Sequence, residues 1–185
     1  PEEVLNQEAW HVPAGSDGLM TVPEWLAPPD KPFKRGVMLG LHAGQTRAHM
    51  YRSVLEAIVL TMKNHMDAMC AELNLALDRI IVSGGGSSGD LFMQIFADVF
   101  GVPAVRNVVN GAAGLGSVIC AAVATGVYDT FDMAIEKMVR VENTFSPDEA
   151  NTTLYKRMNQ DVYQQITRAT DDILEKAYPI FNNLS

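Results

Sequence analysis

Residues 79–103, RIIVSGGGSSGDLFMQIFADVFGVP, decide the fold of this chain. The stretch reads as a short apolar strand, three consecutive glycines and an amphipathic helix that ends at Gly101. Glycine lets a backbone approach a ligand without interference from a Cβ atom, and the first turn of a helix offers unpaired N–H groups to an anion. The order of strand, glycine turn and helix therefore indicates a nucleotide ligand, and a purely structural glycine turn is the plain alternative.

The same glycines satisfy the dinucleotide-binding pattern G-x-G-x-x-G through Gly84, Gly86 and Gly89. That fold requires an acidic residue about twenty positions further on to hold the ribose. Residues 104–109 read AVRNVV and contain no carboxylate, although Arg106 could meet the 2′-phosphate of NADP. Since the rest of the chain reads as helices, an NADP-binding oxidoreductase is the minor alternative.

Composition limits the class of protein. The chain has 185 residues, 48% apolar content and a net charge of -8, which predicts one globular domain whose surface repels nucleic acid and anionic membranes. No apolar run approaches the length of a membrane span and no leader opens the chain, so we expect a cytoplasmic protein. Cys70 and Cys120 read as reduced packing residues, and the four histidines have no metal-ligand spacing.

The remaining segments read mostly as helices. Residues 1–35 hold six prolines and are predicted to form an irregular arm with one short strand near residues 19–22. Residues 46–75 form a long amphipathic helix with a methionine stripe that we expect to fill the core. Residues 112–125 are rich in small side chains, which predicts tight packing against the sheet or the glycine loop. A last helix begins at residues 146–149, SPDE, with Ser146 as its cap.

Two motifs, in the right order, resemble the FGGY carbohydrate kinases. Residues 35–57, RGVMLGLHAGQTRAHMYRSVLEA, stand at the spacing of the C-terminal signature of that family. Residues 84–103, GGGSSGDLFMQIFADVFGVP, are similar to its adenosine-binding loop and helix, with Phe92 in place of the usual tryptophan. The similarity continues through Leu115 and Gly116 into the terminal helix. The chain is therefore identified as a member of this family.

The resemblance implies an α/β fold, helix-rich with a small sheet, that forms part of the second lobe of an actin-like, ribonuclease-H-like kinase. Residues 36–185 would be the nucleotide-binding lobe, and ATP and Mg²⁺ the cofactors. The loop residues expected to meet the nucleotide are Gly84, Gly85, Gly86, Ser87 and Gly89. Gly89 stands where relatives place serine or asparagine near the adenine, so a side-chain hydrogen bond is expected to be lost there.

The resemblance also divides the work of such an enzyme. Relatives keep the catalytic aspartate and the sugar site in their N-terminal half, and this chain begins at Pro1 like an internal piece. We therefore expect no catalytic residue and no metal ligand here, and an isolated chain that is inactive. Glu56 and Asp98 lie on amphipathic helices and are predicted to be solvated or bonded to their own helix. A non-catalytic actin-like ATP-binding module remains the alternative to a sugar or polyol kinase.

The small sheet has a further consequence. A sheet of two or three strands leaves an open edge and uncovered apolar faces. We therefore expect the chain to self-associate as a homodimer.

Overall fold

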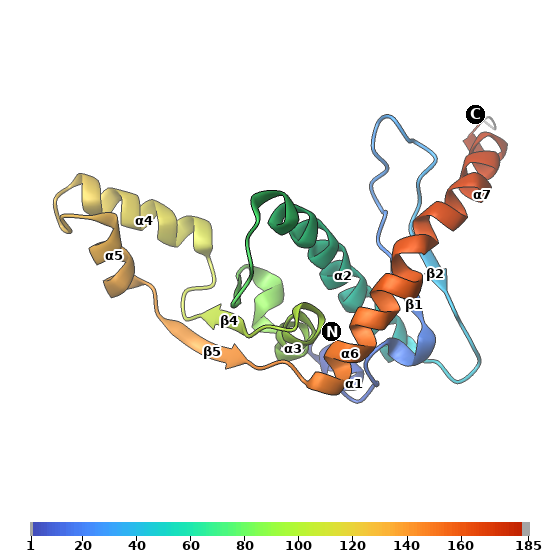
Figure 1. Cartoon of the computed structure of the whole chain (residues 1–185), viewed down its shortest axis with the longest axis horizontal. Helices are drawn as coiled ribbons and strands as arrows, with labels where there is room; N and C mark the ends of the chain where they lie inside the picture. Colours follow the sequence, from blue (N-terminus) through green and yellow to red (C-terminus); the bar gives the residue numbers. More distant parts are fainter. Residues whose placement is uncertain (1, 183–185) are drawn as a thin grey trace.

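The computed structural model describes residues 2–182, and Figure 1 shows their arrangement. A long helix, α2, lies near the middle, with a helical hairpin projecting at one end and the last helix, α7, at the other. The helices are α1 (Glu2–Trp10), α2 (Arg47–Leu73), α3 (Asp90–Phe100), α4 (Ala112–Ala124), α5 (Phe131–Met138), α6 (Glu149–Met158) and α7 (Gln164–Asn182). The strands are β1 (Met20–Val22), β2 (Val37–Leu39), β3 (Ile80–Val82), β4 (Ala104–Asn107) and β5 (Val141–Phe145).

Two small sheets organise the strands. β1 and β2 form an antiparallel pair in which Thr21 lies opposite Met38. In the second sheet β4 is central, parallel to β3 and antiparallel to β5. Ile81 pairs with Val105 in the parallel half, so β3 leads through the glycine loop and α3 back to its neighbouring strand. This is the strand, glycine turn and helix order expected from residues 79–103.

The core gathers around α3. Eight of the eleven residues of that helix are apolar, and seven of the eleven are buried. It packs between α2 and α6 and also contacts α1. The buried cluster includes Ala57, Val59, Leu60, Leu91, Met93, Ile95, Phe96, Ala97, Val99, Ala104, Tyr155, Tyr163 and Ile166. The position of the glycine loop is therefore set by the most deeply buried helix of the domain.

Helix boundaries follow the sequence closely, with some corrections. The arm at residues 1–35 was predicted to be irregular, but residues 2–10 form α1; β1 lies where a strand was expected. A serine at position 87 or 88 was expected to cap α3, but Gly89 precedes the helix, because residues 85–88 make one turn of 3₁₀ helix. The cap of α6 is Asp148, whose side chain accepts from the Asn151 amide, and not Ser146. Residues 159–163 then form a π-helical turn before α7.

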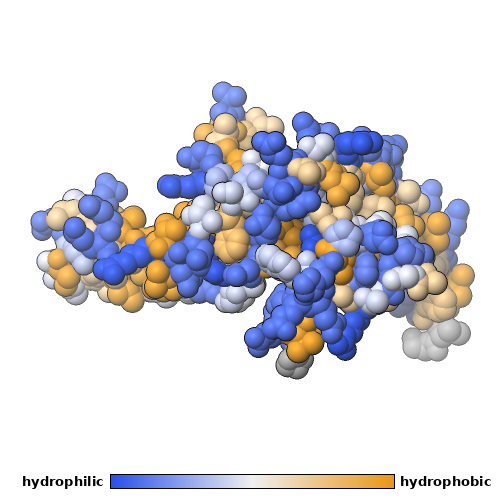
Figure 2. All heavy atoms as spheres, turned by 90° about the horizontal axis from the view of Figure 1, so that it is seen from below, coloured by the Kyte–Doolittle hydropathy of each residue, from blue (hydrophilic) through white to orange (hydrophobic). Residues whose placement is uncertain are grey.

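Two packing predictions were wrong. The small residues of α4 do not pack on the sheet or the loop: only Ile119 is buried, and α4 packs mainly on α5. The methionine stripe of α2 fills no core at Met50, Met62 and Met69, which are 41–53% exposed. Figure 2 shows apolar side chains reaching the surface at the end formed by α4 and α5. These include Val118, Val127, Phe131, Met133 and Ile135.

Among residues 2–182, none of the helices combines the length and the apolar character needed to cross a bilayer.

Candidate functional site: the glycine loop and its cavity

The glycine loop, residues 84–89, has a backbone that side chains would disturb. Gly84 has a φ of +95°, in the region that L side chains rarely adopt. A Cβ atom on Gly86 would lie 2.8 Å from Cε1 of Phe92, so glycine is required for that ring to pack beneath the loop. At Gly85, by contrast, a Cβ atom would meet nothing within 4 Å. The backbone of Gly85 is therefore open to an external group.

The side chain of Asn110 bridges both ends of the glycine loop by hydrogen bonds. Its Oδ1 accepts from the Gly84 amide at 2.9 Å and from the Ser87 hydroxyl at 2.5 Å, and its Nδ2 donates to the Ser88 hydroxyl at 3.0 Å. Ser87 is buried, and its hydroxyl is also 2.8 Å from the Gly84 carbonyl. The Ser87 side chain therefore shapes the loop from inside.

Arg106 braces the same loop from β4. It donates to the carbonyls of Ser87 and Ser88 and forms an ion pair with Asp90 at 2.9 Å. A second ion pair joins it to Glu142 at 3.2 Å, and only 13% of its side chain is exposed. A guanidinium engaged in this way cannot receive the 2′-phosphate of NADP. The geometry removes the basis of the oxidoreductase alternative.

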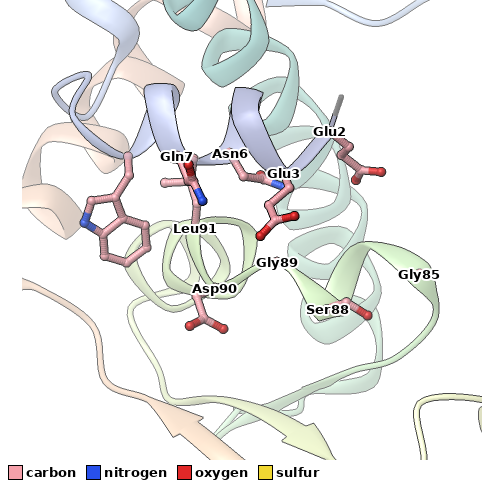
Figure 3. A pocket seen from close by; sticks show the side chains of 10 residues that line it. Glu2, Glu3, Asn6, Gln7, Gly85, Ser88, Gly89, Asp90 and Leu91 are labelled. Atoms are coloured by element: carbon pink, nitrogen blue, oxygen red, sulfur yellow. The ribbon is translucent and has the colours of Figure 1, made fainter.

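A cavity of about 580 Å³ lies between the glycine loop and α1. Figure 3 shows the start of α3 and the loop on one side and the side chains of α1 on the other. Its lining is formed by Glu2, Glu3, Asn6, Gln7, Trp10, Gly85, Ser88, Gly89, Asp90 and Leu91. The volume falls in the range of small-molecule sites. Three carboxylates and no basic side chain line it, so the cavity disfavours phosphate groups and suits an uncharged planar ligand.

Asn6 contributes the amide nearest the loop. Its side-chain oxygen accepts a hydrogen bond of 3.2 Å from the Tyr51 hydroxyl of α2. The pKa of Tyr51 is raised by burial and by the nearby charge of Glu2, so this phenol stays protonated and remains a donor at neutral pH.

The wall formed by α1 is fixed by a buried ion pair on α2. Arg52 donates to the carbonyls of Ala9 and Val12, where α1 ends, and its Nε lies 2.8 Å from Oε1 of Glu56. Burial alone would lower the pKa of Arg52, but its interactions with the Tyr155 hydroxyl and the Glu56 carboxylate raise it above its ordinary value. Burial and the Glu56 charge likewise raise the pKa of the Tyr155 phenol far above its ordinary value.

Glu56 and Asp98 were predicted to be solvated or bonded to their own helix, and only the second of these holds. Glu56 is 2% exposed and accepts from the Gly15 amide, the Ser16 and Tyr155 hydroxyls and Arg52. Asp98 is 1% exposed and accepts from Gln94 on its own helix and from the Asp148 amide and Asn151 at the start of α6. Both carboxylates are bonded to their own helix, as expected, but their other partners are remote in sequence. They hold the fold together.

Other predicted residues lie outside the site. Cys120 is exposed, so its interpretation as a packing residue was wrong, and Cys70 is half-buried. His49 caps α2 together with Thr46, and His42 pairs with Asp17 at 3.0 Å. No group of three or more metal-binding side chains comes together within residues 2–182.

Sequence reasoning missed the residues that surround the glycines. Asn6 and Trp10 stand in the segment predicted to be irregular, and no local signal ties them to a loop about eighty residues away. Asn110 had a signal, because an Asn-Gly pair follows the strand and marks a turn where an amide can bond to backbone.

Comparison with known proteins identifies the family. Residues 3–125 match the sequence profile of the FGGY family of carbohydrate kinases, C-terminal domain. The chain belongs to the FGGY family. A relative, the uncharacterized sugar kinase YgcE of Escherichia coli strain K12, is 47% identical over 182 residues, which is 98% of this chain and 37% of that protein.

Solved FGGY structures share the fold. Xylulose kinase from Rhodospirillum rubrum superimposes with a TM-score of 0.80 and 29% identity, over 94% of this chain and 35% of that one. Plasmodium falciparum glycerol kinase, solved with ADP, gives a TM-score of 0.73 at 17% identity, over 90% of this chain and 34% of that one. The chain is thus a helix-rich α/β domain that matches the C-terminal lobe of FGGY kinases. It spans about a third of the length of these proteins.

Proposed function

We propose that this chain supplies the adenosine-binding side of an ATP-dependent carbohydrate kinase, which transfers the γ-phosphate of ATP to a hydroxyl of a sugar or polyol. The observation that carries the proposal is the juxtaposition of the open Gly85 backbone with a cavity of about 580 Å³. Membership of the FGGY family supports it, as does the ADP bound to the Plasmodium falciparum glycerol kinase.

Charge sets the orientation of the nucleotide. Glu2, Glu3 and Asp90 line the cavity and would repel the phosphates, whereas an uncharged adenosine avoids this cost. We therefore place the adenosine in the cavity against Gly85, Gly86 and Gly89, with the phosphates directed away from α1. Since the described residues bring no metal-binding cluster together, Mg²⁺ would arrive on the phosphates of ATP, which hold it through oxygen ligands.

The chain itself supplies positioning. Gly84 and Ser87 shape the loop through Asn110, and Glu56 and Asp98 are fully occupied by buried hydrogen bonds. We assign no catalytic residue to these segments, since phosphoryl transfer also needs a base for the attacking hydroxyl. We also infer that residues 1–35 are an arm of the lobe formed by residues 36–185, because β1 pairs with β2 across that boundary.

A substitution at Gly85 tests the nucleotide site. Gly85→Ala adds a methyl group where the protein has free space, so the free energy of unfolding should change little. If adenosine packs on this backbone, the same methyl group should weaken ADP binding about tenfold or more, measured by titration calorimetry. Gly114→Ala is the matched control, because its Cβ atom also meets nothing within 4 Å, and helix α4 contributes no residue to the cavity lining. Equal ADP affinity of Gly85→Ala and the unmodified protein would contradict the proposed site.

Activity is tested separately. ADP release from Mg·ATP should depend on the presence of one acceptor from a panel of pentuloses, hexuloses, gluconate, glycerol and other polyols, assayed with the full-length protein. Turnover with one acceptor would identify the substrate. ADP binding without turnover on any acceptor would favour the non-catalytic ATP-binding module and count against the kinase.

A further inference from the structure

Gly89 leaves a vacant side-chain position that Asn6 faces. A Cβ atom on Gly89 would lie 3.7 Å from both Nδ2 and Oδ1 of Asn6, which is ordinary van der Waals contact. Gly89 has φ −89° and ψ 119°, a conformation open to any L residue, so its backbone does not require glycine. The carboxamide on α1 therefore lies where a side chain at position 89 would extend.

A hydrogen bond from Tyr51 fixes the orientation of the Asn6 side-chain amide. Its Oδ1 accepts from the Tyr51 hydroxyl at 3.2 Å, so Nδ2 lies on the opposite edge of the carboxamide. Among the described residues, Nδ2 donates no hydrogen bond, although the side chain is half-buried and lines the cavity. Figure 3 shows Asn6 on α1 above Gly89 and Asp90. A half-buried donor held in place by its neighbour, with no partner of its own, is prepared for a ligand.

We propose that Nδ2 of Asn6 donates a hydrogen bond to an acceptor nitrogen of the adenine ring, and thereby takes the place of a side chain that Gly89 lacks. The inference rests on the proposed nucleotide site, because it needs the adenine to lie beside Gly89. Tyr51 is a positioning residue: its hydroxyl holds the Asn6 oxygen and so leaves the Nδ2 edge of the carboxamide for the ligand.

ADP binding to the purified protein, measured by titration calorimetry, tests the inference. Asn6→Ala should weaken ADP binding five- to tenfold, the loss expected for one hydrogen bond. Tyr51→Phe keeps the ring and frees the amide, so it should weaken binding by a smaller factor, about threefold. Val4→Ala, on the same helix with its side chain half exposed and outside the cavity lining, is the control and should bind ADP like the unmodified protein.

Moving the carboxamide from α1 to the glycine loop distinguishes a role in ADP recognition from a role in the stability of α1. In the double variant Asn6→Ala/Gly89→Asn the carboxamide is anchored on the loop instead of α1, and the space left by Asn6 accommodates it. ADP affinity should return to within about threefold of the unmodified protein, a recovery that a merely structural role of Asn6 would not produce.

The outcomes are distinguishable. If the unmodified protein does not bind ADP, the proposed function fails and this inference falls with it. If it binds ADP and Asn6→Ala binds equally well, only the role of Asn6 is overturned. The role is also overturned if Asn6→Ala weakens binding in step with a loss of unfolding free energy and Gly89→Asn restores nothing.

Discussion

The buried carboxylate of Glu56 offers the strongest test of how this fold is held. Its Oε1 accepts from the Gly15 amide at 2.9 Å, from Arg52 at 2.8 Å and from the Tyr155 hydroxyl at 2.6 Å, and its Oε2 accepts from Ser16 at 2.8 Å. Glu56→Gln keeps the shape but leaves Arg52 charged, 7% exposed and without an ionised partner. Breaking a buried ion pair from one side costs about 3–5 kcal/mol.

A loss of that size is measurable and large. Domains are stable by about 5–15 kcal/mol, so Glu56→Gln should remove a substantial fraction of the free energy of unfolding, measured by urea denaturation with circular dichroism. Arg52→Met/Glu56→Gln removes both charges and should cost less than the sum of the single changes, with a coupling of about 1–3 kcal/mol.

An exposed pair on the same helix provides the control. Lys63 and Asp67 are also spaced i, i+4, but Asp67 is 53% exposed, so Asp67→Asn should cost less than about 0.5 kcal/mol. A cost of under about 1 kcal/mol for Glu56→Gln, or additivity of the Arg52 and Glu56 changes, would refute the reasoning.

Three further predictions follow from other contacts. Burial and the Glu56 charge raise the pKa of Tyr155 in the folded state, so folding favours the neutral phenol. The free energy of unfolding is then full below about pH 10 and falls above it by up to about 1.4 kcal/mol per pH unit. Tyr155→Phe should therefore make the urea midpoint depend less steeply on pH between about pH 9 and pH 11. Arg106→Lys cannot reproduce the forked contacts to the glycine loop and Asp90, so ADP affinity should fall several-fold in calorimetry, and an unchanged affinity would count against the brace. Ile81 is 59% exposed on the edge strand β3, so light scattering should show self-association of the chain that Ile81→Lys reduces; a monomer at all concentrations would overturn the homodimer prediction.

The elements that could be predicted are those with local signals. The periodicity of residues 46–75 gave α2 to within two residues at each end, and the apolar run before the glycines gave β3. By contrast α1, α5 and β5 were missed. β5 reads VENTF and is mostly exposed, so only its pairing with β4 makes it a strand, and that pairing is a tertiary effect.

The candidate site likewise contains residues that the sequence could predict and residues that it could not. The glycines are visible in the sequence because their chemistry is local, and the resemblance rests on them. The partners of Glu56 lie 40, 41 and 99 positions away, and those of Asp98 include residues 50 and 53 positions on. A helical wheel shows a carboxylate on a polar face but not the donors that another segment brings to it. Burial of both groups was therefore beyond the reach of sequence periodicity.

The same turn of α2 connects the core to the cavity. Tyr51 holds the Asn6 amide, and Arg52, the next residue, holds the end of α1 through the carbonyls of Ala9 and Val12. Glu56, one turn further on, supplies the charge that keeps Arg52 in place. Because α1 forms one wall of the cavity, a change at Glu56 should weaken ADP binding even though this residue does not line the site. Stability of the core and recognition of the nucleotide therefore depend on one set of contacts, and a substitution in that set should alter both together.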